Sequence, residues 1–253
     1  MDPSTFFREI EHVQFPWRDR SIPIPAFYRD AGYFGAAFLT PLAAIRERLP
    51  STRLHPVRIA PGTGLTTVTV IEYRDCDIGP YDEISIGFPV TIDRETSLLS
   101  RILPLRAPQM MSYILHLPVT TEFARDAGVE FYGFPKFVAR IVIERDDGRW
   151  TGRLGEGGRE ILDLTVNEPP LHEAPQMRSH LLSQREGRLL RCESMHSACQ
   201  IGSAKGKRGV ELKLGDHPVA DELRALRLGR AAYRFVVPKL EIILTPAIEG
   251  FDA

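Results

Sequence analysis

The sequence predicts an α+β fold that is mostly antiparallel β, with a sheet that curls or closes into a barrel-like shape around a central cavity and carries a few short helices. Two observations lead to this prediction. Segments in which β-branched or aromatic residues alternate with other residues recur along the chain, and short turn sequences separate them. Only three segments show helix signals, and each is short. Many strands with few helices to cover them favour a sheet that closes on itself.

The composition fits a single domain over residues 1–253 and a small-molecule partner. With 43% hydrophobic residues, the chain can bury a sizeable core. Its 32 basic and 33 acidic residues give a formal net charge of -1. Bulk charge therefore gives no reason to expect nucleic acid or an anionic membrane as partner.

The chain is expected to act in the cytoplasm. Its first thirty residues contain no basic-then-apolar leader, and no apolar run approaches the ~20 residues that cross a bilayer. Three cysteines cannot all pair within one chain, which suits a reducing compartment.

The first half of the chain predicts an arm, a helix and three strands. Residues 1–28 hold four prolines with aromatic residues between them, which favours an irregular N-terminal arm. A helix is expected to begin with Thr40 as N-cap and Pro41 at its first position, and to end at Pro50. The predicted strands are 33–39, 64–73 and 84–92, with residues 79–83 in the turn between the last two.

The second half predicts a meander, a long hairpin and two helices. Thr121 is expected to cap a short helix that ends at Gly128, and a helix over 218–228 has Asp216 near its cap. The predicted strands are 109–117, the meander 137–144, 149–154 and 159–166, a hairpin of 189–201 with 210–214, and a last strand at 232–244.

Lys136 is the first candidate for a functional residue, because Phe134, Pro135, Phe137 and Val138 surround it in the sequence. Removing an ammonium group from water favours the neutral amine, and a neutral lysine amine attacks carbonyl carbons to form a Schiff base. Most lysines beside aromatic residues lay their methylenes along an apolar surface and keep their ammonium in water. The neighbouring residues alone favour this second interpretation.

Two motifs resemble those of the acetoacetate decarboxylase-like family. Gly128-x-Glu130-x-x-Gly133-Phe134-Pro135-Lys136 resembles the family's active-site lysine segment. Gly79-Pro80-Tyr81-Asp82-Glu83, followed by Gly87-Phe88-Pro89-Val90, resembles the signature whose glutamate lies in the active site. The motifs stand in the family's order, about fifty residues apart, and the resemblance extends loosely from about Tyr33 to about Pro246.

The resemblance implies a catalytic pair, a substrate class and an assembly. Lys136 would form a Schiff base with a small-molecule keto acid, and Glu83 would stabilise its ammonium or handle protons. Tyr81 and Glu130, which belong to the two motifs, are substrate-binding candidates, although Glu130 could instead hold its loop by accepting backbone N–H groups. No organic cofactor or metal is implied, and the family's habit implies a homo-oligomer.

Three departures from the family pattern put acetoacetate itself in question as the substrate. Phe137 stands where the decarboxylase has a second lysine, so Phe137 would have to keep Lys136 dry, unless strand alternation turns its ring into the core. The arginine expected to hold the substrate carboxylate aligns with Ala31, and Arg29 fits only with a two-residue shift. A further expected acid falls near Val68.

Three functions remain open at this stage. The first is a Schiff-base lyase that decarboxylates a β-keto acid through Lys136. The second is an aldolase or dehydratase that acts on a pyruvate-like 2-keto acid through the same lysine, and the third is a non-catalytic small-molecule binding protein of the same fold. Cys192, His196 and Cys199 carry zinc-ligand side chains, but Cys199 would point away from the other two on a strand, so no metal site is predicted.

Overall fold

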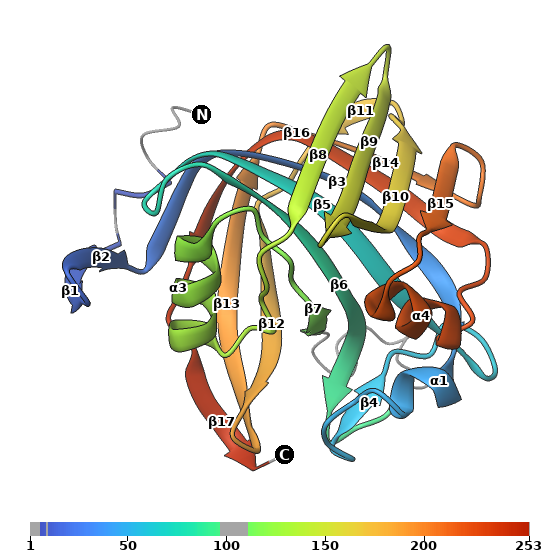
Figure 1. Cartoon of the computed structure of the whole chain (residues 1–253), viewed down its shortest axis with the longest axis horizontal. Helices are drawn as coiled ribbons and strands as arrows, with labels where there is room; N and C mark the ends of the chain where they lie inside the picture. The colour runs from blue at the N-terminus through green and yellow to red at the C-terminus, as the bar shows by residue number, and fades with distance from the viewer. Residues whose placement is uncertain (1–5, 9, 97–110, 253) are drawn as a thin grey trace.

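One large, strongly curved sheet organises the computed structural model, which describes residues 6–8, 10–96 and 111–252 (Figure 1). Seven strands of this sheet pair in a closed ring, in the order β16-β3-β5-β6-β7-β12-β13 and back to β16. They are β3 (Ala26–Pro41), β5 (Thr63–Cys76), β6 (Tyr81–Ile92), β7 (Met111–His116), β12 (Met177–Arg185), β13 (Arg188–Ala198) and β16 (Ala231–Leu244). Apart from the parallel contact of β7 with β12, the pairings in the ring are antiparallel. The predicted α+β fold with a curled, mostly antiparallel sheet is confirmed.

A second, four-stranded sheet crosses the large one (Figure 1). It consists of β8 (Arg140–Asp146), β9 (Arg149–Glu156), β10 (Arg159–Asn167) and β15 (Val210–Leu214). A Cβ atom on Gly152 would lie 2.6 Å from Val70 Cγ2, so a glycine in β9 lets the two sheets approach closely. The largest hydrophobic core fills this interface, and the predicted three-stranded meander is confirmed.

The N-terminal arm is more regular than predicted. Strand β1 (Val13–Trp17) pairs with β2 (Arg20–Ile24), and β3 already begins at Ala26. The prediction of an irregular segment over 1–28 is therefore wrong for these residues. Pro16 and Pro23 fit because a two-stranded hairpin leaves one edge of each strand unpaired.

The first two predicted helices form, but their bounds differ from the prediction. Thr40 belongs to β3, where its hydroxyl bonds the Thr66 hydroxyl at 2.8 Å, so α1 (Leu42–Arg46) begins after Pro41 without a side-chain cap. Thr121 caps α3 (Glu122–Tyr132) as predicted, since its hydroxyl accepts the Ala124 N–H. However, α3 continues through Gly128 and ends at Gly133, whose φ of 61° is the left-handed conformation that glycine favours.

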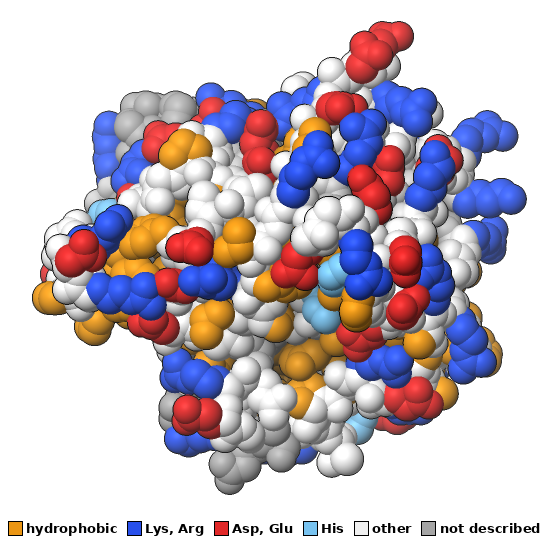
Figure 2. Space-filling view, viewed as in Figure 1, with side chains coloured by type: hydrophobic (Ala, Val, Ile, Leu, Met, Phe, Trp, Pro, Cys, Tyr) orange, Lys and Arg blue, Asp and Glu red, His pale blue; other side chains and the backbone are white. Residues whose placement is uncertain are grey.

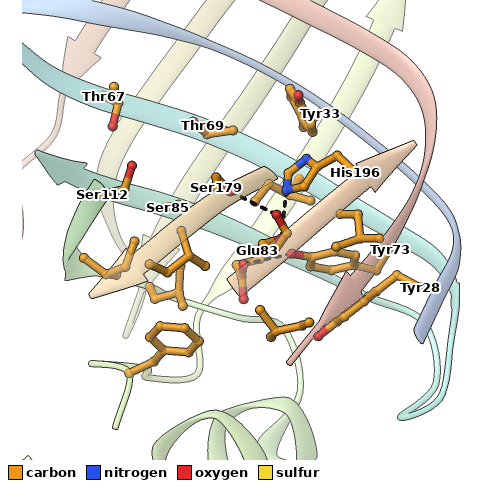
Figure 3. A pocket seen from close by; sticks show the side chains of 18 of the residues that line it. Tyr28, Tyr33, Thr67, Thr69, Tyr73, Glu83, Ser85, Ser112, Ser179 and His196 are labelled. Carbon is orange, nitrogen blue, oxygen red and sulfur yellow. Dashed lines mark hydrogen bonds between the residues drawn. The ribbon is translucent and has the colours of Figure 1, made fainter. Parts of the chain in front are cut away.

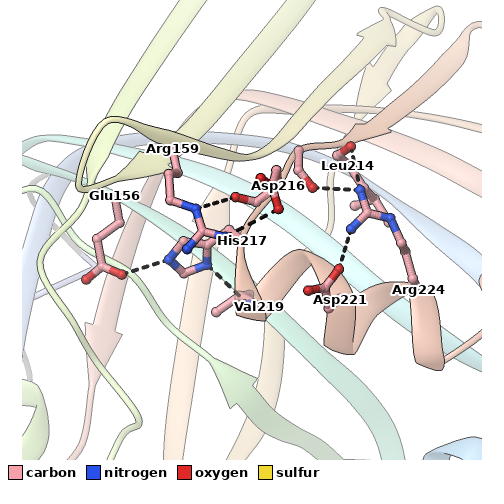
Figure 4. Close-up of polar contacts among 9 residues, drawn as sticks. Glu156, Arg159, Leu214, Asp216, His217, Val219, Asp221 and Arg224 are labelled. Carbon is pink, nitrogen blue, oxygen red and sulfur yellow. Dashed lines mark hydrogen bonds and ion pairs between the residues drawn. The ribbon is translucent and has the colours of Figure 1, made fainter.

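Helix α4 (Pro218–Ala225) is tied to the four-stranded sheet by a polar network (Figure 4). Its N-cap is His217, next to Asp216 as predicted: Nδ1 accepts the Val219 N–H at 3.2 Å, and Nε2 lies 3.0 Å from Glu156 Oε2. Arg224 donates to the carbonyl of Leu214 at 3.0 Å and also to that of Gly215, which holds the helix against the end of β15.

Long-range pairing differs from the prediction in the last third of the chain. The expected hairpin of 189–201 with 210–214 does not form, because β13 pairs with β12, β16 and β17 (Ile248–Asp252), whereas β15 pairs with β10. Strands β12 and β17 were not predicted, nor were the short strands β4 (Leu54–Pro56), β11 (Leu171–Glu173) and β14 (Gln200–Lys205). The predicted strands at 33–39, 64–73, 84–92 and 232–244 are confirmed and extended. The strand expected at 109–117 is found as β7, although residues 109 and 110 lie outside the described residues.

The surface carries both signs of charge. Figure 2 shows basic and acidic side chains interspersed over one face, as the net charge of -1 leads one to expect. Within the described residues, no helix has the length and apolar character needed to span a bilayer.

Candidate active site

Lys136 and Glu83 form a buried pair inside the ring of strands. Lys136 Nζ lies 2.7 Å from Glu83 Oε2, and each side chain is only 6% exposed. Glu83 belongs to β6 and not to a turn, which corrects the predicted position of its motif. Lys136 lies in the segment between α3 and β8.

Residues 117–119 hold the lysine segment against β6. Leu117 N–H donates to the carbonyl of Pro135 at 3.2 Å, and Val119 N–H to that of Phe137 at 2.9 Å. Val119 also forms isolated bridges with Glu83 and Val138. Backbone bonds on both sides of Lys136 therefore position its side chain opposite Glu83.

Gly128 makes room for Lys136. A Cβ atom at this position would lie 2.5 Å from Lys136 Cε and closer still to Cδ. A glycine inside a helix costs about 1 kcal/mol relative to alanine, so its presence in the middle of α3 calls for a local reason. The close passage of the lysine side chain provides that reason.

Three tyrosines complete the surroundings of the pair. The Tyr73 hydroxyl donates to Glu83 Oε1 at 3.1 Å, and the Tyr81 ring lies 5.3 Å from Lys136 Nζ, within the range of a cation–π contact. The hydroxyls of Tyr28 and Tyr81 are 3.4 Å apart. Burial raises the pKa of all three phenols well above its usual value, so they stay protonated and available as donors.

A cavity of about 280 Å³ opens beside this pair, within the ring (Figure 3). Its lining combines aliphatic and aromatic side chains with many hydroxyls. The hydroxyl-bearing side chains are Thr67, Thr69, Ser85, Ser112, Ser179, Ser194, Tyr28, Tyr33, Tyr73, Tyr81 and Tyr233. Lys136 and Glu83 are the only lysine, arginine or acidic side chains among the described residues that line it.

Three of the six predicted site residues meet at the cavity. Lys136, Glu83 and Tyr81 line it, whereas Arg29 and Glu130 do not. Arg29 pairs with Asp77 at 2.7 Å on the outside of the ring, with 43% of its side chain exposed. The structure therefore gives Arg29 no contact with a ligand in this cavity.

Glu130, on α3, serves the N-terminal hairpin. It accepts a bond from Trp17 Nε1 at 2.5 Å and pairs with Arg18, which fastens β1 and β2 to the helix. The alternative in which Glu130 supports structure agrees with these contacts, although its partners are side chains and not the backbone N–H groups expected.

Phe137 turns toward the core and not toward the cavity. Its ring packs against the large hydrophobic cluster, on the side of the four-stranded sheet, while Phe134 takes a place in the cavity lining. Val68, where the family pattern has an acid, is fully buried in the same cluster.

Neither the hydroxyl groups of the cavity nor the place of His196 in its wall was predicted from the sequence. The alternation Thr67-x-Thr69-x-Ile71-x-Tyr73 was used to predict a strand, yet it also places these four side chains on one face. A threonine-rich face opposite the valines of the same strand was the available signal. His196 and Ser194 alternate in the same way on β13, but the strands that face them come from distant segments, so this pair alone does not indicate a cavity.

His196 is neutral inside the cavity wall. Its Nε2 lies 2.8 Å from Ser194 Oγ, while Nδ1 is enclosed and has no partner among the described residues. Burial lowers the pKa of His196 to about 4. No cluster of three or more His, Cys, Asp or Glu side chains suited to a metal ion occurs in the described part of the chain.

The family model for acetoacetate decarboxylase matches residues 13–237. The chain belongs to the acetoacetate decarboxylase family. Comparison with curated proteins gives no match.

Three solved structures show a similar fold. The acetoacetate decarboxylase of Legionella pneumophila is 15% identical with a TM-score of 0.69, and the alignment covers 94% of this chain and 92% of the other. A second acetoacetate decarboxylase structure is 19% identical with a TM-score of 0.64, over 94% and 91% of the two chains. The enduracididine biosynthesis enzyme MppR, complexed with the condensation product of pyruvate and imidazole 4-carboxaldehyde, is 15% identical with a TM-score of 0.63, over 88% of each chain.

Proposed function

We propose that the protein is a Schiff-base-forming lyase that decarboxylates a β-keto acid through Lys136. One observation carries the proposal: a lysine and a glutamate are paired, each side chain is only 6% exposed, and both line the cavity. A buried ion pair is weak evidence for a stabilising role, because desolvation of both charges offsets their attraction. A catalytic role for the pair explains why both side chains line a cavity that is large enough for a small ligand.

The first step creates the nucleophile. Glu83 Oε2 is near enough to take a proton from the Lys136 ammonium, which leaves a neutral amine. The amine nitrogen attacks the keto carbon, a C–N bond forms and the keto oxygen takes up a proton. Loss of water then leaves a protonated imine.

The second step breaks the carbon–carbon bond. The pair of electrons that joined the carboxylate carbon to its neighbour moves toward the imine nitrogen as carbon dioxide leaves, and an enamine results. Protonation of the enamine carbon and hydrolysis of the imine release a ketone and regenerate Lys136. The net reaction consumes one proton and yields a ketone and carbon dioxide.

Borohydride trapping tests the proposal directly. Protein incubated with a panel of β-keto and 2-keto acids and then reduced should carry an adduct that peptide mass spectrometry maps to Lys136. Lys136→Met should form no adduct, whereas Lys205→Met, a change at an exposed lysine, should react like wild type. An adduct on Lys205 or Lys207 in place of Lys136 would overturn the assignment.

A second candidate is aldol or dehydration chemistry on a pyruvate-like 2-keto acid through the same imine. The cavity of about 280 Å³ favours it, since this volume far exceeds the roughly 10–15 Å³ that one water requires and leaves room for a second reactant. A solved structure of MppR, which shares the fold, is a complex with the condensation product of pyruvate and imidazole 4-carboxaldehyde. Release of carbon dioxide from the accepted keto acid would favour the lyase, and a product that retains the carboxylate would favour this alternative.

A binding protein that has lost turnover is the remaining alternative. Such a protein would bind keto acids without forming a reducible adduct, so the same trapping experiment separates it. Assembly as a homo-oligomer and a cytoplasmic location stay predictions of the sequence.

A further inference from the structure

The cavity continues beyond Glu83 into a part lined by hydroxyl groups. Across β5 and β6, Glu83 lies opposite Ile71, the next cavity-facing pair is Thr69 with Ser85, and Thr67 follows. Each step of two residues along a strand spans about 7 Å. The threonine and serine hydroxyls of these strands therefore begin about 7 Å beyond Glu83.

The opposite wall supplies a hydroxyl of defined orientation. Ser194 lies on β13, and His196 Nε2 is 2.8 Å from its oxygen. A neutral imidazole carries one N–H. If Nδ1 carried it, a donor would be buried without an acceptor, which is costly. With the proton on Nε2, His196 donates to Ser194 Oγ, and the Ser194 hydrogen is left for another acceptor.

Several other hydroxyls in the cavity have no partner among the described residues. Thr69, Ser85, Tyr33 and Tyr233 line the cavity, and none of their hydroxyls bonds to a residue that the structure describes. Burial raises the pKa of the Tyr33 phenol to about 12, so it remains a donor. Polar groups in protein interiors are normally hydrogen-bonded, and here a ligand or water must supply the partners.

The charges of the lining limit what can bind there. Lys136 and Glu83 neutralise each other, and His196 is uncharged, so the described lining offers a charged tail no counter-ion. An apolar tail would leave the hydroxyls of Thr69 and Ser85 without a partner, whereas the Thr67 hydroxyl already donates to the Gly87 carbonyl at 3.2 Å and can still accept a bond. An uncharged tail that carries oxygen satisfies both conditions.

We propose that a hydroxyl subsite, formed by Thr67, Thr69, Ser85, Ser194 and His196, binds the uncharged, hydroxyl-bearing tail of the substrate. Ser194 donates to the tail, and His196 acts as the residue that positions Ser194. The proposal rests on the proposed function for the head of the molecule, the keto acid that meets Lys136. The preferred keto acid is then longer than four carbons and hydroxylated beyond the keto group.

Unreactive probes test the subsite apart from the chemistry. Hexanoate, 6-hydroxyhexanoate and adipate have equal chain length and no keto group, and they differ only in an apolar, hydroxylated or charged end. Calorimetry with the wild-type protein should give about tenfold tighter binding for 6-hydroxyhexanoate than for hexanoate, the ratio expected from one neutral hydrogen bond, and the weakest binding for adipate. Equal affinities, or no detectable binding of any of the three, would overturn the subsite.

Variants identify the residues that carry the preference. Ser194→Ala should remove the preference for 6-hydroxyhexanoate, His196→Gln, which retains an N–H donor, should keep most of it, and His196→Leu should lose it. Ser203→Ala, an exposed serine on β14, is the matched control. If Ser194→Ala does not fold, Thr69→Val tests the same subsite. Variants that weaken all three acids equally would show a structural role only and would refute the proposal.

The two proposals fail separately. If borohydride traps no adduct on Lys136 but 6-hydroxyhexanoate still binds preferentially, the lyase function falls and the subsite stands. If adducts form on Lys136 but the hydroxylated acid has no advantage, the subsite falls and the lyase function stands.

Discussion

Strands β5 and β6 have two faces that meet two different interiors. On one face Val68, Val70 and Ile84 are fully buried against the core beneath the four-stranded sheet. On the other face Thr69 and Glu83 border the cavity. The packed face fixes the strands in place, so the cavity face can keep polar groups in position even where they lack protein partners. Neighbouring residues of one strand thus have different roles, one in packing and one at the cavity. Substitutions on the two faces should therefore have different effects.

On the cavity face, Glu83→Gln should have the largest effect. Glutamine can still bond Tyr73 and Lys136, but it cannot take the lysine proton, so turnover of the accepted keto acid should fall about 10²-fold or more. Borohydride should still trap a measurable adduct. The control is Asp82→Asn, the adjacent residue, which does not line the cavity. Turnover of Glu83→Gln within a factor of two of wild type would return Glu83 to an ordinary structural carboxylate.

Gly128→Ala should separate activity from stability. The new methyl group overlaps the end of the Lys136 side chain, which is flexible and can move away, so the rate of trapping should fall about tenfold or more. Alanine favours the helix by about 1 kcal/mol, so the melting temperature should hold or rise. Val129→Ala, an exposed change on the same helix, should leave trapping unchanged. A slower reaction together with a lower melting temperature would instead indicate general damage to α3.

Sequence reasoning succeeded where the signal was local and failed where distant segments meet. Alternation predicted β5 and β6, and the threonine cap predicted the start of α3, because neighbouring residues determine both features. The helix was predicted to end at Gly128 because glycine commonly ends helices. In the folded chain Gly128 lies inside α3 and leaves space for the Lys136 side chain, a contact that the sequence does not show. Strand β15 pairs with β10 and not with β13 for a comparable reason, since partner choice depends on surfaces buried far along the chain.

The candidate site shows the same division. The two motifs brought Lys136, Glu83 and Tyr81 into the prediction, and the structure places all three at the cavity. Arg29 was chosen with a shifted alignment, and it pairs with Asp77 outside the ring. His196 depends on contacts between β13 and its neighbours, which no short motif encodes.

A pH titration should show the burial of His196 on the cavity face. Burial lowers its pKa to about 4 from an ordinary 6.5, so below pH 6.5 the unfolded chain takes up the proton first. The stability that depends on a neutral His196 is therefore fully present above pH 6.5 and is lost as the pH falls. At pH 5 the free energy of unfolding should be lower by about 2 kcal/mol. Denaturant unfolding at pH 8 and pH 5 should show a smaller loss of stability in His196→Gln than in wild type.

Asp82 acts in the opposite direction and does not confuse that comparison. Burial raises the pKa of Asp82 to about 6, so the folded state binds the carboxyl proton more tightly than the unfolded chain does. The stability gained from this proton is lost as the pH rises through about 6. Both proteins carry Asp82, so its contribution cancels in their difference. Identical pH dependence of the unfolding free energy in wild type and His196→Gln would mean that water reaches the His196 imidazole.

The smallest expected change in stability gives the sharpest test of the two faces, because the two variants exchange a methyl group and a hydroxyl group at adjacent positions. Val70→Thr keeps the volume but buries a hydroxyl against Gly152 inside the hydrophobic cluster, at a cost of about 1–3 kcal/mol if it finds no acceptor. Thr69→Val removes a hydroxyl that bonds no described residue, so stability should change by about 0.5 kcal/mol or less. Urea midpoints of the two variants measure the difference. Equal losses of stability would mean that the cavity face is packed as tightly as the core. A stable Thr69→Val that binds 6-hydroxyhexanoate more weakly would instead mean that this hydroxyl serves ligand binding and not folding.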